Sequence, residues 1–153
     1  MSSRAETLVC SNRKLQARLD VEERLEAGLV LTGSEVKALR AGRASLEGAF
    51  VRVDGADLWL HGMHVGPFEH AGAFAHEPRR VRKLLVKHRQ REWLRGRLSG
   101  GGMVLVPLRL YFRGPWAKVE LALGRVRKQA DRREQIRAEL DRREARAVVA
   151  RRR

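Results

Sequence analysis

Five histidines are the side chains in this chain that most readily ligate a metal or transfer a proton. His61 and His64 lie three residues apart in a segment that alternates like a strand, and that separation places them on opposite faces. No Asp, Glu or Cys stands near them at a spacing typical of zinc ligands. We therefore expect ordinary surface or loop histidines, with no metal and no cofactor.

Two further patterns are typical of enzymes but are incomplete here. Glu22, Glu23 and Glu26 suggest acid–base chemistry, but 33% of the chain is charged, so neighbouring carboxylates are expected, and no nucleophile stands beside them. The glycines at 100–102 are not followed by Gly-Lys-Ser or Gly-Lys-Thr, which indicates a flexible connection rather than a phosphate loop. The single cysteine, Cys10, excludes a disulfide framework. We expect a binding protein, not an enzyme.

The positive charge is concentrated in two stretches of the sequence. The formal net charge is +15, and residues 79–97 (+8) together with residues 125–153 (+7) supply all of it. Such segregation predicts two faces that attract a polyanion. The second stretch lacks the broad apolar face of a membrane-surface helix, so structured RNA fits better than a lipid surface. With no apolar run near 18 residues and no signal-peptide core, we expect a cytoplasmic protein that binds no membrane.

Short alternating segments predict the elements that position these charges. Strands are expected at 19–31 (interrupted near 22–24), 50–53, 58–65, 103–112 and 116–123, with a bulge or sheet edge at Pro107. A two-turn helix follows Thr32 or Ser34, docks through Val36 and Leu39, and ends at Gly42. This pattern predicts a mainly β, α+β fold, an oligonucleotide-binding-like antiparallel β-barrel with peripheral helices and a basic C-terminal tail.

Three segments are expected along the chain. Residues 1–11 are predicted to be a disordered tail, 12–124 the RNA-binding barrel, and 125–153 a basic tail that becomes helical on a surface that supplies its missing contacts. The apolar spacing of 81–93 predicts a helix in the first basic stretch, with Trp93 either packed in the core, which is the favoured interpretation, or exposed beside Arg95 as a surface for RNA. Trp116, close to Lys118, offers a stacking surface beside a phosphate-binding cation.

Four collinear blocks resemble the small protein B family, the tmRNA-binding proteins of bacterial trans-translation. They read EAGLVLTGSEVKALRAGRASL, MHVGPFEH, HEPRRVRKLL and VPLRLYFRGPWAKVELALGRVRKQADRRE, and the likeness runs from about Asn12 to Glu134. The resemblance implies a barrel that grips the tRNA-like half of tmRNA. It also implies a tail, helical on the ribosome, that enters the empty message channel of a stalled small ribosomal subunit. Together they would rescue the ribosome and allow the incomplete polypeptide to be tagged.

The resemblance also assigns residues to the two partners. Glu26, Leu85 and Lys118 match RNA-contacting positions: Glu26 would accept a hydrogen bond or orient an arginine, Leu85 would pack on a base or ribose, and Lys118 would meet phosphate. Arg82 and Lys83 flank that patch, and Asn12, Arg13 and Lys14 match the family's first block. The tail positions that would contact the ribosome are Arg127, Lys128, Asp131, Arg132, Arg133 and Arg137.

The chain departs from the family pattern at three positions. Ala17 and Leu19 stand where a His and a Tyr are usual, and Ala130 replaces a ring before the tail. A lost stacking contact costs about 1–3 kcal/mol, unless the additional arginines compensate. A generic RNA-binding protein, associated with ribosomes or their assembly, is the alternative interpretation. A monomer is expected in either case.

Overall fold

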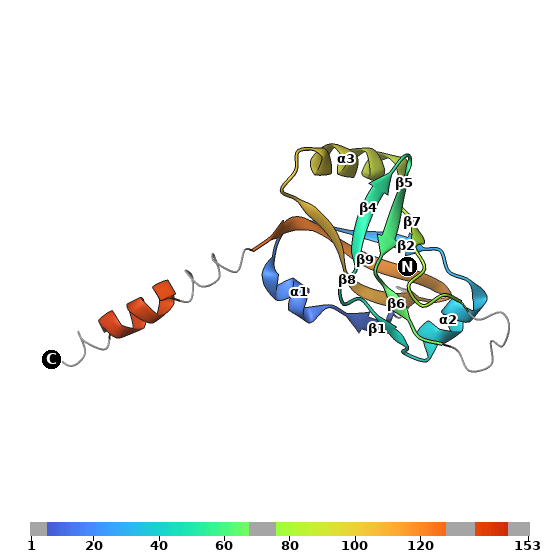
Figure 1. The fold of residues 1–153 in the computed structure, drawn as a ribbon, viewed down its shortest axis with the longest axis horizontal. Helices are drawn as coiled ribbons and strands as arrows, with labels where there is room; N and C mark the ends of the chain where they lie inside the picture. Colours follow the sequence, from blue (N-terminus) through green and yellow to red (C-terminus); the bar gives the residue numbers. More distant parts are fainter. Residues whose placement is uncertain (1–5, 68–75, 128–136, 147–153) are drawn as a thin grey trace, which may run out of the picture.

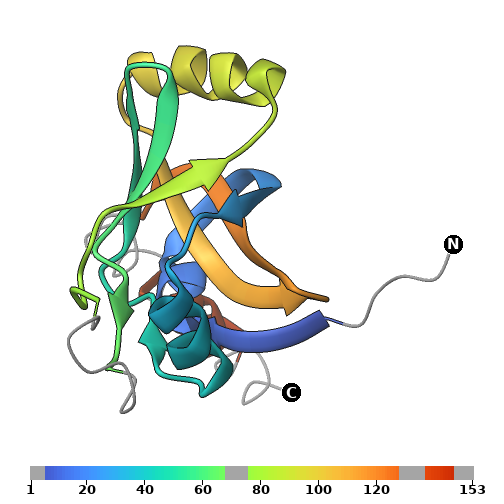
Figure 2. The same cartoon turned by 90° about the vertical axis from the view of Figure 1, so that its right-hand side faces the viewer.

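The computed structural model describes residues 6–67, 76–127 and 137–146, and the central element is one curved antiparallel sheet (Figures 1 and 2). The sheet has seven strands in the order β1-β8-β9-β2-β7-β5-β4. The strand bounds are β1 Glu6–Ser11, β2 Leu19–Leu29, β4 Phe50–Asp54, β5 Asp57–His61, β7 Arg82–Leu85, β8 Val104–Arg113 and β9 Trp116–Val126. A separate ladder joins β3 (Ala44–Ser45) to β6 (His64–Val65).

The sheet curls around one apolar core but does not close into a hydrogen-bonded barrel. The end strand β4 packs against β8, yet no ladder joins the two ends of the sheet in the part of the chain that the structure describes. Leu60, Met63 and Phe112 are fully buried between the two sides. Three helices lie on the outside: α1 (Arg13–Arg18), α2 (Gly33–Arg40) and α3 (His88–Ser99). The predicted α+β class is confirmed, with an open barrel.

The segment from Leu19 to Gly42 follows the sequence prediction closely. The register of β2 shifts between Val21 and Glu23, where the strand was expected to be interrupted. Thr32 then caps α2, and its hydroxyl and the Glu35 carboxylate form a reciprocal capping box. Leu39 is buried, and Gly42 ends the helix with a φ of 75°.

The N-terminal prediction is wrong for residues 6–11, which form β1 and pair with β8. Leu8 is the register partner of Tyr111, and Val9 and Cys10 pack against the core, which keeps the segment in place. Pro107 lies beyond the part of β8 that β1 pairs with and next to a register shift between β8 and β9, so the bulge predicted at Pro107 is confirmed and its missing N–H is tolerated there. Residues 1–5 lie outside the described residues.

The first basic stretch is a strand followed by a helix, not the single helix predicted. In β7, Arg82 and Leu84 are buried while Lys83 and Leu85 face outward, an alternation of period two. An arginine on the buried face concealed that alternation in the sequence. The helix α3 begins only at His88, and it leaves Trp93 42% exposed, so the expected core position of this ring is also wrong.

The body of the protein extends slightly beyond the predicted boundary at residue 124. The strand β9 continues to Val126, and the backbone N–H of Arg127 donates to the Arg18 carbonyl. Farther on, residues 137–146 form a helix that is exposed along its length. The helix start predicted at Asp131 lies outside the described residues, and folding of the tail on a partner stays a prediction. None of the described helices has the length and apolarity to cross a membrane.

Candidate nucleic-acid interface

A continuous cross-strand row of five residues crosses the outer face of the sheet. Its members are direct register partners on neighbouring strands: Leu8, Tyr111, Lys118, Gly28 and Leu85. Paired residues of antiparallel strands project from the same face, so these side chains stand together. The row contains two predicted RNA contacts, and Leu85 is 53% exposed on it.

Glu26, the third predicted contact from the resemblance, lies on this same face. It precedes Gly28 by two residues in β2, and residues two apart in a strand point the same way. Between Leu85 and Lys118, Gly28 contributes only backbone, and a Cβ built there would lie 3.4 Å from the Leu85 Cβ. The structure therefore brings Glu26, Leu85 and Lys118 onto one face, with the Leu85 side chain packed against Gly28.

The carboxylate of Glu26 is already engaged by its neighbours. The Tyr111 hydroxyl donates to one oxygen, and Arg113 Nη1 donates to the other at 2.8 Å. Burial, followed by the bond to Glu26, raises the pKa of Tyr111, so the phenol remains a protonated donor at neutral pH. Of the two roles expected for Glu26, orienting an arginine is the one that this geometry supports.

Arginines surround the Tyr111 ring. Arg109 donates to Glu120 at 2.9 Å, and its guanidinium carbon lies 4.9 Å from the ring centroid. The hydrogen bond to Glu120 raises the pKa of Arg109, and the bond to Glu6 likewise raises the pKa of Arg113. Both side chains are therefore fixed as cations beside an aromatic ring. This arrangement suits a phosphate next to a base or sugar.

Lys118 and Trp116 complete the outer face. Within the described part of the chain, the Lys118 ammonium has no ion-pair partner, which leaves it available for a phosphate. Trp116 is the register partner of Arg113 at the β8–β9 turn, and its side chain is 64% exposed. We call this group of residues the sheet face. Its members are Glu26, Gly28, Leu85, Tyr111, Arg113, Trp116 and Lys118.

The prediction that Arg82 contacts RNA is wrong. Its side chain is fully buried, and its guanidinium donates to Glu35 and, at 3.0 Å, to the Met63 carbonyl. Lys83 does lie on the outer side of β7, like Leu85, with its ammonium 3.5 Å from the Asp57 carboxylate.

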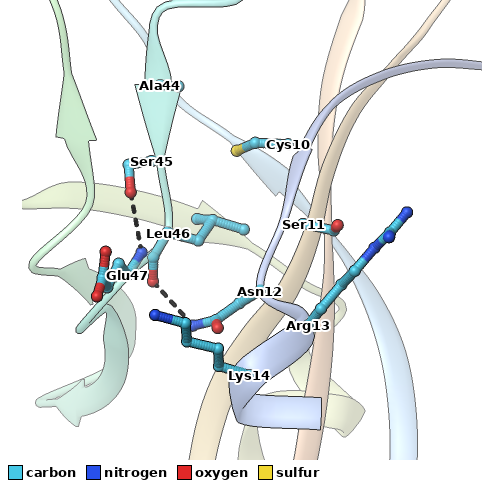
Figure 3. Close-up of a pocket in the computed structure, with 9 residues that line it drawn as sticks. All are labelled: Cys10, Ser11, Asn12, Arg13, Lys14, Ala44, Ser45, Leu46 and Glu47. Carbon is cyan, nitrogen blue, oxygen red and sulfur yellow. Dashed lines mark hydrogen bonds between the residues drawn. The ribbon is translucent and has the colours of Figure 1, made fainter. Parts of the chain in front are cut away.

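Asn12, Arg13 and Lys14 lie at the start of α1, where they line a pocket of about 470 Å³ against residues 44–47 (Figure 3). The Asn12 amide is occupied: its oxygen accepts from the Leu15 N–H and its nitrogen donates to the Leu46 carbonyl at 3.2 Å. Asn12 thus fixes α1 to the β3 segment, while Arg13 and Lys14 are exposed. Their contact with RNA stays a prediction.

Two of the departures from the family pattern, Leu19 and Ala17, differ in how far they are buried. Leu19 is 5% exposed and packs with Val106 and Leu108, so a ring at position 19 would point into this cluster rather than at RNA. The expected loss of a surface contact there is wrong. Ala17 is exposed, as that expectation requires.

Of the predicted tail contacts, Arg127 belongs to the body, because it pairs with Asp20 at 2.8 Å. Arg137 is the first described residue of the exposed helix. Lys128, Asp131, Arg132 and Arg133 lie outside the described residues.

The described residues contain no cluster of three side chains that could hold a metal ion. Burial raises the pKa of the Cys10 thiol to about 11, so it is protonated at neutral pH and is a poor nucleophile.

Arg109, Tyr111 and Arg113 were missed as members of the site. Their signal was present in the sequence as a polar period of two in the segment RLYFR. The signal is weak, because a tyrosine in this position is equally typical of an ordinary strand, and the structure leaves it only 3% exposed.

A curved, oligonucleotide-binding-like sheet with fixed cations and rings on its outer face defines a nucleic-acid-binding protein. The chain belongs to the SmpB protein family, whose model matches residues 9–151.

The sequences of several relatives align with nearly the whole length of this chain. The SsrA-binding protein of Roseiflexus castenholzii is 46% identical over 147 residues, which cover 95% of this chain and 90% of the relative. That of Desulforudis audaxviator is 46% identical over 151 residues, covering 99% and 96%. A solved structure described as "tmRNA-SmpB: a journey to the center of the bacterial ribosome" is 36% identical, with a TM-score of 0.64, and covers 84% of this chain and 87% of its own.

Proposed function

We propose that this protein binds tmRNA, the SsrA RNA, and delivers it to stalled ribosomes for trans-translation. The observation that carries the proposal is the sheet face, where Glu26, Leu85 and Lys118 come together from three separate parts of the sequence. The names of the relatives and the 36% identical tmRNA-SmpB structure support the choice of RNA.

The sheet face divides the work of RNA binding among its residues. Lys118 meets a phosphate, while the exposed Leu85 side chain, which packs against Gly28, receives a base or ribose. Glu26 acts through Arg113, which it holds in place as a donor toward the RNA, while the buried Tyr111 hydroxyl donates its one proton to the same carboxylate. An acid is useful here because it fixes an arginine without contacting the polyanion itself.

The tail binds the second partner, the small ribosomal subunit. In a stalled ribosome the message channel of this subunit is lined by RNA phosphates and contains no messenger RNA. There the arginines of the exposed helix at 137–146 and of the basic sequence around it pair with ribosomal phosphates. The protein acts in the cytoplasm as a monomeric RNA-binding factor, and it catalyses no reaction itself.

Replacing Lys118 or Glu26 by alanine should weaken binding of the tRNA-like domain of tmRNA. The first change removes a charge-assisted contact with phosphate, and the second releases Arg113 and Tyr111. A hydrogen bond to a charged group contributes about 1.5–3 kcal/mol, so a 10- to 100-fold rise in Kd is expected. Isothermal titration or filter binding with the wild-type RNA fragment measures it.

Two matched variants control for charge alone. Arg52→Ala removes one exposed cation from β4, two strands beyond β7, and Glu23→Ala removes one exposed acid from β2; neither residue belongs to the sheet face. Each should bind like the unaltered protein. If bulk tRNA and tmRNA bind equally tightly to the wild-type chain, the generic RNA-binding alternative replaces the proposal.

A further inference from the structure

The outward side of α3 carries an arrangement of side chains that the sheet face does not use. Arg89, Trp93 and Arg97 recur every four residues, so they stand in one row on the helix surface. All three are exposed, and Trp93 is 42% so. Gly96, three residues after Trp93, faces open space, because a Cβ there would meet nothing within 4 Å.

This row is held rigidly by the body of the protein. The opposite side of α3 buries Leu94, and Arg95 donates to the Gly55 carbonyl in the β4–β5 turn. Arg97 pairs with Glu22 of β2, and its guanidinium carbon lies 5.7 Å from the Trp93 ring centroid. A ring fixed in the exposed position loses little conformational freedom when a ligand covers it.

The charge of the helix indicates the chemistry of that ligand. Within α3 there are four arginines and one acid, Glu92, and Lys87 precedes the first turn. A cationic surface that also exposes an indole ring suits a polyanion with flat groups, and nucleic acid combines the two. An anionic protein surface would match the charge but offers no bases for the ring.

The position of α3 favours the same RNA that the sheet face binds. Only Val86 separates Leu85 of the sheet face from Lys87, the residue that caps α3. The helix lies across the far end of the β4–β5 hairpin, beyond the β7 end of the sheet face (Figure 1). An RNA resting on Leu85 therefore meets α3 if it continues in that direction.

We infer that the exposed row of α3 is a second contact for tmRNA, in which Trp93 stacks on a base or sugar and Arg89 and Arg97 pair with flanking phosphates. The two arginines lie eight residues apart, roughly 12 Å along the helix axis. The inference rests on the proposed function and enlarges its footprint from the sheet face to a helix at the edge of the fold.

The test measures Kd for the tRNA-like domain of tmRNA with Trp93→Ala, Trp93→Phe and Arg89→Ala. Loss of one stacked base should raise Kd about 5- to 100-fold in Trp93→Ala, whereas Trp93→Phe should retain most of the affinity. Arg89→Ala should weaken binding as well. Combined with Lys118→Ala, the effect of Trp93→Ala should add in free energy, as expected for separate contacts.

The outcomes separate this inference from the proposed function. If Trp93→Ala binds tmRNA like the wild type while Lys118→Ala is weakened, the α3 contact is refuted and the sheet face stands. Weakened binding to small ribosomal subunits alone would also refute it, in favour of ribosomal RNA. If both variants bind tmRNA normally, the proposed function fails too. Thermal unfolding of each variant shows that it is folded.

Discussion

Removal of residues 128–153 is expected to abolish peptide tagging on stalled ribosomes while leaving the affinity for tmRNA largely intact. The sheet face lies wholly within β2, β7, β8 and β9, and β9 ends at Val126. Residues after Arg127 carry many of the cations proposed to enter the message channel. Tagging in cells that lack their own tmRNA-binding protein, beside titration with purified tmRNA, measures the two effects separately.

The end point of the truncation is set by the structure. Arg127 must be kept, because its N–H donates to the Arg18 carbonyl and its guanidinium pairs with Asp20. A shorter chain ending at residue 124 would lack the end of β9. It serves as a control that shows how a misfolded truncation behaves in the same assays. If the chain ending at Arg127 is as stable as the full chain in thermal unfolding but has lost tmRNA binding, the proposed division of labour between sheet and tail is incorrect.

Glu35→Ala is expected to reduce the free energy of unfolding by about 3–5 kcal/mol, the usual cost of removing one partner of a buried ion pair. Glu35 and Arg82 are both fully buried, and Glu35 also accepts from Arg80 at 2.5 Å and from the Thr32 N–H at 2.9 Å. The change leaves the Arg82 charge unpaired inside the protein. Urea unfolding at neutral pH measures it.

The same pair predicts how stability depends on pH. Burial alone would raise the pKa of Glu35, but hydrogen bonds from Arg80, Thr32 and Arg82 outweigh it, so the pKa is lowered. The stabilisation is therefore complete above the unfolded pKa of about 4.3 and is lost as the pH falls through the lower folded value. Glu35→Ala should lack this part of the acid transition.

A double variant distinguishes an unpaired charge from a simple cavity. Glu35→Ala combined with Arg82→Leu removes both charges and should recover a large part of the lost stability. Glu47→Ala, which removes an exposed acid, is the matched control and should change little. A cost below about 1 kcal/mol for Glu35→Ala alone would show that the pair contributes no more than an exposed one.

Local signals in the sequence predicted the elements whose causes are local. The α2 capping residue, the interruption of β2 and the β4–β5 hairpin each depend on neighbouring residues. The β1 strand and the burial of Arg82 depend on partners about 100 and 47 residues away, so the sequence around them gave no indication. A charged residue facing the core reverses the usual polarity of a strand and conceals its period.

The candidate site was predictable only in part. The likeness to a family supplied Glu26, Leu85 and Lys118, and the register then showed that they share a face. It did not supply the donors that Glu26 holds, because Tyr111 and Arg113 meet that carboxylate across the sheet, 85 and 87 positions along the chain. Hydrogen bonds of that range follow from the fold, not from spacing.

The central place of β9 determines when this protein can fold during its own synthesis. As the last strand of the chain, β9 lies between β8 and β2 and supplies a ladder to each. At about 5–20 residues per second, roughly 100 residues and 5–20 s separate the emergence of β2 from that of β9. Until then, β2 and β8 each lack the strand that joins them, and the sheet face lacks Trp116 and Lys118. The surface proposed to bind tmRNA can therefore form only after β9 has left the ribosome.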